Sequence, residues 1–98
     1  MDVEFSDPSL DRLETDVAFN AGFSRDIVRS FRKLMQIIRA APDERSFYAL
    51  KSLHFEKLKG NRSHQRSMRL NKQWRLIIEL KTSQSGKVAV IVSIEDYH

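Results

Sequence analysis

The chain lacks several features that would indicate particular classes of protein. It contains no cysteine, only three glycines and two prolines, and its apolar runs stay far below the roughly 20 residues that a membrane helix needs. The absence of cysteine excludes disulfides and thiolate metal sites. The N-terminal stretch MDVEFSDPSLDRLETD lacks the basic-then-apolar order of a signal peptide. We therefore expect a soluble, cytoplasmic protein with no membrane contact.

Length and composition indicate one small domain. The chain has 98 residues, of which 41% are hydrophobic, an ordinary share for a globular protein and too high for a disordered one. A chain of this size buries one core of modest size. We therefore treat residues 1–98 as a single domain.

Charge is unevenly distributed, although the net charge is only +4. Residues 1–20 carry six acids and one base, whereas residues 45–75 carry nine bases and a single acid, Glu56. A local positive excess of this kind attracts polyanions. It predicts contact with nucleic acid, and a solvated basic surface without a ligand is the plainer alternative.

The first half of the chain has helical patterns. The segment SDPSLDRL predicts a helix with Pro8 in its first turn and an end near Phe19. A second helix is predicted over residues 24–41, because apolar residues recur there at helical spacing and Pro42 disfavours helical geometry before it. The stretch VEF near the N-terminus suits a short strand, and DERSFYAL suits a short helical turn.

After Gly60 the hydrophobic period changes from helical to alternating. The apolar residues then fall on even positions, namely Met68, Leu70, Trp74, Leu76, Ile78, Leu80, Val88, Val90, Val92 and Ile94. Strand residues two apart share a face, so hairpins turning at 71–73 and 82–87 would place all of them on one side. The predicted fold is α+β, with two N-terminal helices packed on one face of a three- to four-stranded antiparallel sheet.

The odd positions would form the opposite face of this sheet, where a ligand could bind. They are Ser67, Arg69, Arg75, Ile77, Glu79, Ala89, Ile91, Ser93, Glu95 and Tyr97. Two arginines and a tyrosine therefore share the face away from the helices. Cross-strand ion pairs, such as Arg75 with Glu95 or Glu79, are the purely structural alternative.

A basic loop precedes these strands. In SLHFEKLKGNRSHQR the pair Gly60-Asn61 predicts a turn, and basic residues surround it, namely Lys57, Lys59, Arg62 and Arg66. A loop of this composition suits phosphate binding. The three histidines, at positions 54, 64 and 98, match no standard spacing of metal ligands. We therefore expect neither a metal nor another cofactor.

These residue types suit the cleavage of RNA, which carries its own nucleophile in the 2′-hydroxyl group. Cleavage needs a base, an acid and cations for the charge that develops on phosphorus. Histidine can transfer protons near neutral pH, tyrosine is a weaker candidate, and lysine and arginine suit the phosphate. Motifs for other reactions, such as a Walker loop or a nucleophile elbow, are absent from the sequence.

The stretch LHFEKLKGNRSHQRSMRLNKQWRLIIEL, with the terminal VSIEDYH, resembles the HigB-type toxins of the RelE/ParE superfamily. These are toxins of bacterial type II toxin–antitoxin pairs, also called plasmid maintenance killer proteins. The match runs from about Leu53 to His98, and its most specific pieces are LKGNR, SMRLNKQWR and DYH. The resemblance implies two helices packed on an antiparallel sheet. It also implies a ribosome-dependent endoribonuclease, or mRNA interferase, that cuts translated mRNA in the A site by 2′-hydroxyl attack.

The resemblance implies partners as well. They are a cognate helix-turn-helix antitoxin (HigA-like), the ribosome and mRNA, with operator DNA contacted only through the antitoxin. Its motifs assign catalytic roles to Asp96, Tyr97, His98, Arg75 and Lys59. In some relatives a histidine lies three residues before the lysine, whereas in this chain the gap from His54 to Lys59 is five; His54 is a further catalytic candidate. The candidates for holding RNA backbone are Lys57, Arg62, Arg66, Arg69 and Asn71.

In the hypothesis that follows, His98 or Tyr97 transfers protons and Asp96 orients them. Arg75 and Lys59 stabilise the pentavalent phosphorane. Trp74 lies on the even face, which favours core packing over base stacking. Two alternatives stay open: a ParE-like poison of DNA gyrase, against which the DYH ending argues, and a non-catalytic nucleic-acid-binding domain with the arginine-rich helix 24–41 in a groove.

Overall fold

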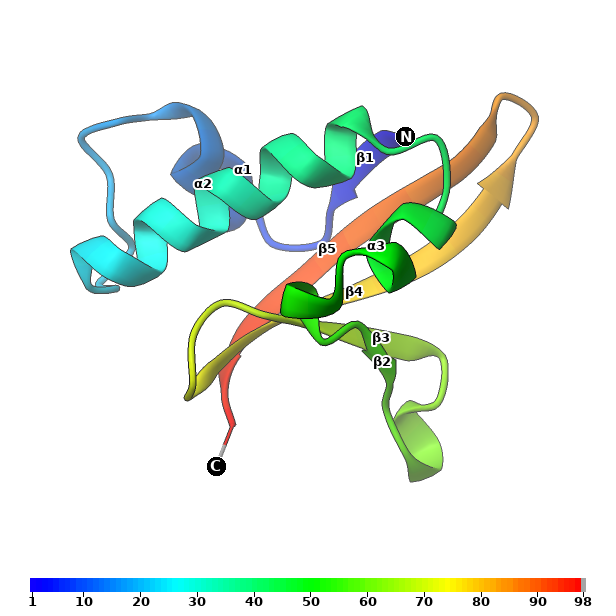
Figure 1. Ribbon diagram of the computed structural model, residues 1–98. Coiled ribbons are helices and arrows are strands. Elements are labelled where there is room, and N and C mark those ends of the chain that lie inside the picture. The colour runs from blue at the N-terminus through cyan, green and yellow to red at the C-terminus, as the bar shows by residue number, and fades with distance from the viewer. Residues whose placement is uncertain (98) are drawn as a thin grey trace.

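Five strands form one sheet in the computed structural model of the chain, which describes residues 1–97 (Figure 1). Its strands are β1 (Asp2–Phe5), β2 (Glu56–Lys57), β3 (Gln65–Arg69), β4 (Trp74–Ser83) and β5 (Gly86–Asp96). The spatial order is β1-β5-β4-β3-β2, and every neighbouring pair is antiparallel except β1 with β5, which is parallel. The expected α+β class is confirmed. The expectation of a wholly antiparallel sheet of three or four strands was wrong, because β1 pairs with the edge of β5.

Three α-helices accompany the sheet: α1 (Pro8–Thr15), α2 (Arg25–Ala40) and the short α3 (Arg45–Ala49). Two 3-10 turns, η1 (Lys51–Leu53) and η2 (Gly60–Arg62), follow α3. Helices α1 and α2 begin where the sequence predicts. The side chains of Asp7 and Ser24 accept hydrogen bonds from backbone N–H groups in their first turns. Helix α1 ends earlier than the predicted Phe19.

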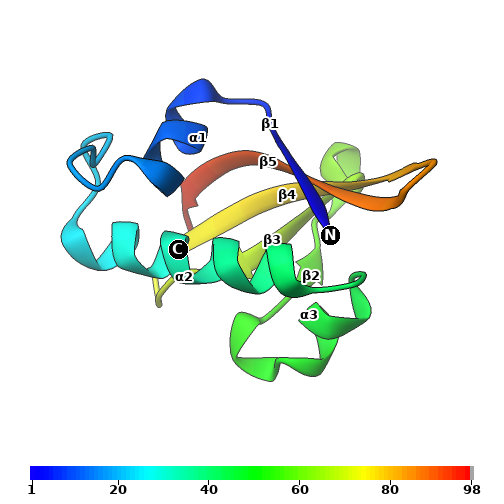
Figure 2. The same ribbon diagram turned by 90° about the horizontal axis from the view of Figure 1, so that it is seen from above.

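Helix α2 covers one face of the sheet, and the main core lies between the two layers (Figure 2). Phe31, Met35 and Ile38 of α2 are fully buried, as the helical spacing predicted. From the sheet, the core takes Met68, Leu70, Leu76 and Ile78, with Trp74 and Leu80 packed against its edge. Trp74 is partly buried and packs against this core, which agrees with the predicted core packing.

A β-bulge in β5 changes the alternation of this strand. Ile77 pairs with Ser93, but the next residue, Ile78, pairs with Ile91. Val92 is therefore an extra residue with no partner of its own in β4. On the N-terminal side of the bulge the odd positions of β5 face α2, whereas on its C-terminal side the even positions do.

The bulge overturns part of the predicted core. Ala89 and Ile91 are fully buried in the main core instead of lying on the opposite face. Val90 and Val92 are only partly buried, and neither belongs to the main core. Val88 is buried but pairs with Lys81, in the row that points away from α2. Ile94 pairs with Leu76 and stays on the helical side, as predicted.

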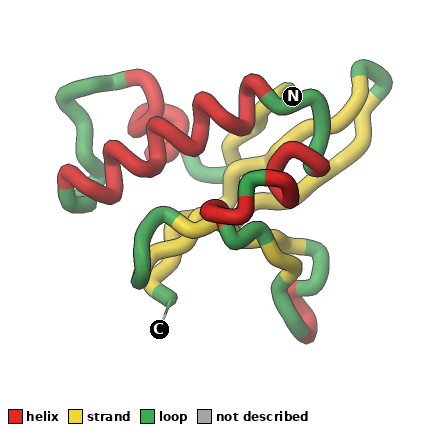
Figure 3. Tube along the Cα trace, viewed as in Figure 1, coloured by secondary structure: helices red, strands yellow, loops and turns green. Residues whose placement is uncertain are grey.

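The C-terminal end of β5 and the loop between β2 and β3 both lie on the side of the sheet away from α2 (Figures 1 and 3). This leaves the polar ends of β3, β4 and β5 uncovered by the helical layer. Within residues 1–97, no helix is both long enough and apolar enough to span a membrane.

Candidate functional site

The sheet face opposite α2 carries the polar residues of the candidate site. Arg69 of β3 pairs with Arg75 of β4, and Arg75 pairs with Glu95 of β5. Residues in one row across a sheet project to the same face, so the register brings these three side chains together. The ion pair of Arg75 with Glu95 or Glu79, which was the purely structural alternative, is not formed. Arg75 pairs with Glu56, and Glu95 pairs with Arg62.

Arg75 is held by the segment that precedes and enters β2. Its Nη1 donates to the carbonyl oxygen of His54 at 3.0 Å, and its Nη2 donates to Glu56 Oε1 at 3.1 Å. His54 has a φ of +47°, in the left-handed region that non-glycine residues rarely adopt. The Arg75 guanidinium carbon lies 5.3 Å from the centre of the Tyr97 ring, within cation–π range. These contacts orient the guanidinium beside Tyr97.

Arg62, on the loop between β2 and β3, reaches the end of β5. Its Nη1 and Nη2 donate to the two carboxylate oxygens of Glu95 at 3.0 and 2.8 Å, and its Nε donates to Gln65 Oε1 at 2.9 Å. The Ser93 hydroxyl also donates to Glu95, at 2.7 Å. Bidentate arginine–carboxylate pairs fix geometry as well as charge. The pair therefore joins the basic loop to the last strand.

Between this loop and the C-terminus lies an open pocket with a volume of about 460 Å³. We call it the C-terminal pocket; it is lined by Glu56, Lys57, Leu58, Lys59, Arg62 and Tyr97. Neither lysine forms an ion pair with a carboxylate of residues 1–97. Both ammonium groups are exposed, and they leave the pocket with an excess of positive charge. A phosphate group suits such a pocket.

The remaining predicted residues of the described chain lie around this centre. The His54 ring accepts a hydrogen bond at Nε2 from Arg69 Nη1, at 3.1 Å. Asp96 accepts one from Gln73 Nε2 at 3.1 Å, and the Tyr97 amide donates to the Gln73 carbonyl. Tyr97 is therefore tied to the β3–β4 turn.

Two predicted RNA-binding residues have structural contacts of their own. The Asn71 side-chain oxygen accepts from the amides of Gln73 and Trp74 and closes the β3–β4 turn. Arg66 pairs with Ile78, in the row that faces the helices, and its Nη1 donates to the carbonyl oxygens of Ser63 and Gln65. Neither is among the residues that line the C-terminal pocket. The predicted role of His98 lies outside the described residues.

Sequence reasoning missed two acidic residues of this site. Glu56 and Glu95 hold the guanidinium groups of Arg75 and Arg62, respectively. Glu56 was visible as the one acid in a basic segment, and Glu95 by its place on the odd face. Their partners depend on the path of the loop, which alternation does not describe. In the region from 1 to 97 no cluster of three or more potential metal ligands is found.

The Arg62–Glu95 contact shifts the pKa of both groups. The hydrogen bonds from Arg62, and to a smaller extent the one from Ser93, hold the pKa of the Glu95 carboxyl below its ordinary value. The same hydrogen bonds raise the pKa of Arg62. Because the pKa of Glu95 is depressed in the folded state, its stabilising contribution is complete above about pH 4.5 and is lost as the pH falls through the folded-state pKa.

We expect Glu95→Gln to lower the free energy of unfolding at pH 7 by about 0.5–1 kcal/mol, the range of partly exposed pairs. The difference in the free energy of unfolding between wild type and variant should become smaller towards pH 3. Urea unfolding followed by circular dichroism at both pH values measures it. Glu4→Gln is the matched control, because its pair with Lys81 is half exposed and should contribute less. Equal effects of the two substitutions would contradict the prediction.

Solved structures of toxins share the fold of this chain. They include a YoeB/ParE toxin from Agrobacterium tumefaciens, with 17% identity, a TM-score of 0.60 and full coverage of both chains. YafQ from Escherichia coli BL21(DE3) shares 13% identity with a TM-score of 0.61, over 97% of this chain and 91% of that one. A chain of the YoeB–YefM complex from Staphylococcus aureus shares 20% identity with a TM-score of 0.58, over 100% of this chain and 97% of that one. At these identities the likeness shows the fold alone.

The family follows from the sequence itself. The family model of HigB-like toxins, described as the RelE-like toxin of the type II toxin–antitoxin system HigB, matches residues 3–98. The chain belongs to this family, and is therefore a HigB-type toxin of the RelE/ParE superfamily. The resemblance seen in LKGNR, SMRLNKQWR and DYH is confirmed. No curated protein matches the chain in sequence.

Proposed function

We propose that this toxin is a ribosome-dependent endoribonuclease that cuts translated mRNA in the A site. The observation that supports this most directly is the C-terminal pocket, where Lys57, Lys59 and Arg62 surround Tyr97. Arg75 lies against the same tyrosine ring. Cations from one loop and one strand thus meet a group that can exchange a proton, which is the combination that RNA cleavage requires.

In the proposed reaction the 2′-hydroxyl oxygen attacks the adjacent phosphorus and the bond from phosphorus to the 5′-oxygen breaks. The products are a 2′,3′-cyclic phosphate and a 5′-hydroxyl. One proton leaves the 2′-hydroxyl and one is delivered to the 5′-oxygen, through Tyr97 or His98, with Asp96 as the orienting group. Arg75 and Lys59 stabilise the charge on the phosphorane. Lys57, Arg62, Arg66, Arg69 and Asn71 are the candidates for contacts with RNA.

In this proposal His54 orients two arginines and is not assigned as a second proton-transfer group. Its carbonyl holds Arg75 and its ring nitrogen holds Arg69. Both contacts orient cations, so we assign His54 as a positioning residue whose role in proton transfer remains to be tested by substitution. Substitution of the His54 ring should disturb the position of Arg69 more than that of Arg75, because Arg75 is held by the backbone carbonyl, which every substitution retains.

The ribosome supplies what an open pocket lacks. The C-terminal pocket is open, and its cations would hold a phosphate without selecting a base, so we expect the orientation of the mRNA to come from the ribosome. The family also implies an antitoxin, and YoeB of Staphylococcus aureus is known in complex with YefM. We propose a helix-turn-helix, HigA-like antitoxin as the cognate partner, with operator DNA bound only through it. Cytoplasmic location belongs to the same proposal.

Arg75→Ala should lower the rate of mRNA cleavage by about 10²-fold, the typical effect of removing one preorganised donor from a developing oxyanion. The rate is measured in a reconstituted translation system by mapping new 5′ ends of a translated mRNA. Arg75→Lys should recover part of the loss, because it restores charge without the bidentate fork. Lys81→Ala, in an exposed pair on the far half of β4, should leave the rate unchanged.

The same experiment separates the alternatives. Codon-level cuts that require the ribosome support the proposal. DNA breaks with intact transcripts would identify a gyrase poison, and tight RNA binding without cuts or growth arrest would identify a non-catalytic binding domain. Loss of cleavage in Arg75→Ala together with loss of the folded circular dichroism spectrum would leave Arg75→Lys as the deciding variant.

A further inference from the structure

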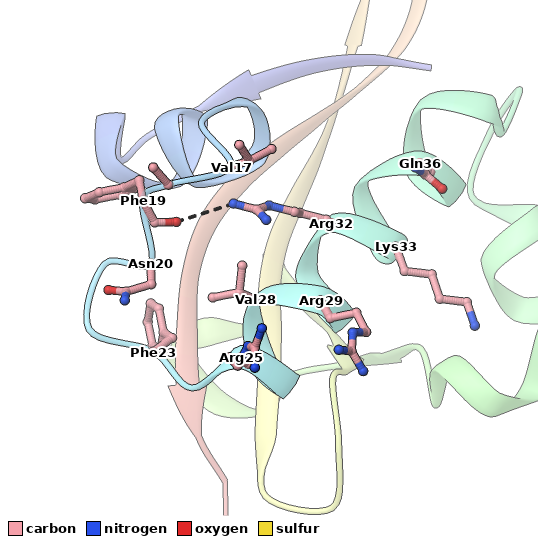
Figure 4. A pocket seen from close by; sticks show the side chains of 11 residues that line it. Val17, Phe19, Asn20, Phe23, Arg25, Val28, Arg29, Arg32, Lys33 and Gln36 are labelled. Atoms are coloured by element: carbon pink, nitrogen blue, oxygen red, sulfur yellow. Dashed lines mark hydrogen bonds between the residues drawn. The ribbon is translucent and has the colours of Figure 1, made fainter.

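A second pocket lies on the helical side of the molecule, away from the candidate site (Figure 4). It has a volume of about 580 Å³, larger than the C-terminal pocket, and no lining residue is common to the two. Its walls are residues 17–20 and 23 of the loop between α1 and α2, and the facing side of α2 from Arg25 to Gln36. We call it the helix–loop pocket. Nothing in the proposed RNA cleavage uses it.

The loop wall of this pocket is held in a fixed shape. Arg32 of α2 donates three hydrogen bonds to backbone carbonyls, those of Leu13 at 3.0 Å, Asp16 at 2.9 Å and Phe19 at 3.3 Å. These carbonyls lie at and beyond the end of α1, where a cation is favourable. Within the loop, the Asn20 side chain also accepts from the Gly22 amide at 2.9 Å. A wall that is already ordered loses little entropy when a ligand binds.

Apolar residues are among those that line the pocket. Val17 is 87% exposed, the highest value among the large exposed apolar residues, and Val28, Phe19 and Phe23 lie around the same hollow (Figure 4). A concave site that is partly lined by apolar residues suits an apolar side chain of a ligand.

Basic residues line the side of the pocket formed by α2. Arg25, Arg29 and Lys33 follow one another at intervals of four, so they lie along one line of the helix. None of the three side chains forms an ion pair or hydrogen bond with any residue from 1 to 97. By contrast Arg39, six residues after Lys33, is paired with Glu14 at 2.7 Å. The pocket therefore offers three cations that the protein itself leaves uncompensated.

We propose that the helix–loop pocket binds an acidic segment of a partner protein, with one apolar side chain in the hollow and carboxylates on Arg25, Arg29 and Lys33. A peptide fits better than RNA because the aromatic rings are already engaged. The guanidinium carbon of Arg12 lies 4.1 Å from the centre of the Phe19 ring. Phe23 packs edge-on against Trp74, with 5.9 Å between the ring centres. Binding of single-stranded RNA relies on aromatic faces that are free to stack.

The test uses the full chain and a short synthetic peptide in which a central leucine is flanked by aspartate and glutamate. Because the chain has no cysteine, Val17→Cys provides a single attachment point for an environment-sensitive fluorophore at the pocket. Titration should change its emission in a saturable way. The label reports only where the peptide binds. The affinity itself is measured by isothermal titration of the unlabelled wild-type chain.

Arg29→Glu should weaken binding of the peptide by about tenfold, because it replaces an attraction by a repulsion. Lys51→Glu is the matched control: it makes the same change in net charge at an exposed lysine outside the pocket and should leave binding unchanged. A peptide with asparagine and glutamine in place of the acids, and one with serine in place of leucine, should each bind at least about tenfold more weakly.

Three binding results would overturn the proposal, and the oligomeric state provides a fourth. The three are no saturable binding of the acidic peptide, equal losses in Arg29→Glu and Lys51→Glu, and a single-stranded RNA that binds more tightly than the peptide and whose binding Arg29→Glu weakens. A dimer that dissociates in Arg29→Glu, detected by sedimentation, would show that a second copy of the chain occupies the pocket instead. None of these readouts involves RNA cleavage, so failure here is distinct from failure of the proposed nuclease.

Discussion

A chain that ends at Asp96, without Tyr97 and His98, should cleave translated mRNA about 10²–10⁴-fold more slowly, the usual contribution of general acid–base catalysis. The physical reason is that the two removed residues are the proton-transfer candidates, and Tyr97 stands in the C-terminal pocket beside Lys59, Arg62 and Arg75. The rate is measured by 5′-end mapping in a reconstituted translation system.

The shortened chain should still fold. Tyr97 is 41% exposed, and the last core residue of β5, Ile94, is retained together with its pairing to Leu76. Circular dichroism and the midpoint of urea unfolding check this point. A folded, shortened chain that cleaves mRNA at the wild-type rate would remove the terminus from the site.

Two single substitutions test which of the two terminal residues transfers the proton. Tyr97→Phe keeps the ring against Arg75 and removes only the hydroxyl, whereas His98→Gln removes only the imidazole. The residue whose substitution reproduces most of the truncation effect is the main proton-transfer group. If its pH–rate profile also changes shape, the residue exchanges a proton in the rate-limiting step.

Ile91→Ala should lower the free energy of unfolding by about 2–5 kcal/mol, the range for truncating a large aliphatic side chain in a core. Ile91 is fully buried and belongs to the main core beneath α2, so the surrounding side chains cannot fill the space that it leaves. For a small domain with about 5–15 kcal/mol of stability, such a loss is large. Urea unfolding followed by circular dichroism measures it.

Val92→Ala is the control that tests the bulge. Val92 is the extra residue of β5 and is only partly buried, so its truncation should cost about 1 kcal/mol or less. Strict alternation of β5 would put Val92 in the core and Ile91 on the opposite face. A larger effect at Val92 than at Ile91 would therefore show that the bulge is absent in solution.

Much of the candidate site was accessible from alternation and motif. The odd positions of β3 and β4 and the end of β5 lie on the face away from α2, so Arg69, Arg75 and Glu95 meet there as predicted. The motifs LKGNR and DYH pointed to the loop and the terminus that form the C-terminal pocket. Their catalytic roles remain predictions that the variants above test.

The partners of the charged groups were not accessible in this way. Arg75 binds Glu56 and the carbonyl of His54, and Arg62 crosses from its loop to Glu95. These contacts join segments 19–33 residues apart, through a loop whose path follows neither period 2 nor period 3.6. Sequence spacing predicts which face a residue is on, and it does not predict which long side chains from a loop will reach that face.

By itself the sequence determined the α+β class, the starts of two helices, the apolar face of α2 and membership of the HigB-like toxin family. These follow from local periodicity and short motifs. Only the tertiary structure decided the parallel pairing of β1 with β5, the bulge at Val92 and the helix–loop pocket. The run KVAVIVSI is apolar on both of its faces, so the packing of α2 and the register with β4 had to choose which residues of β5 are buried.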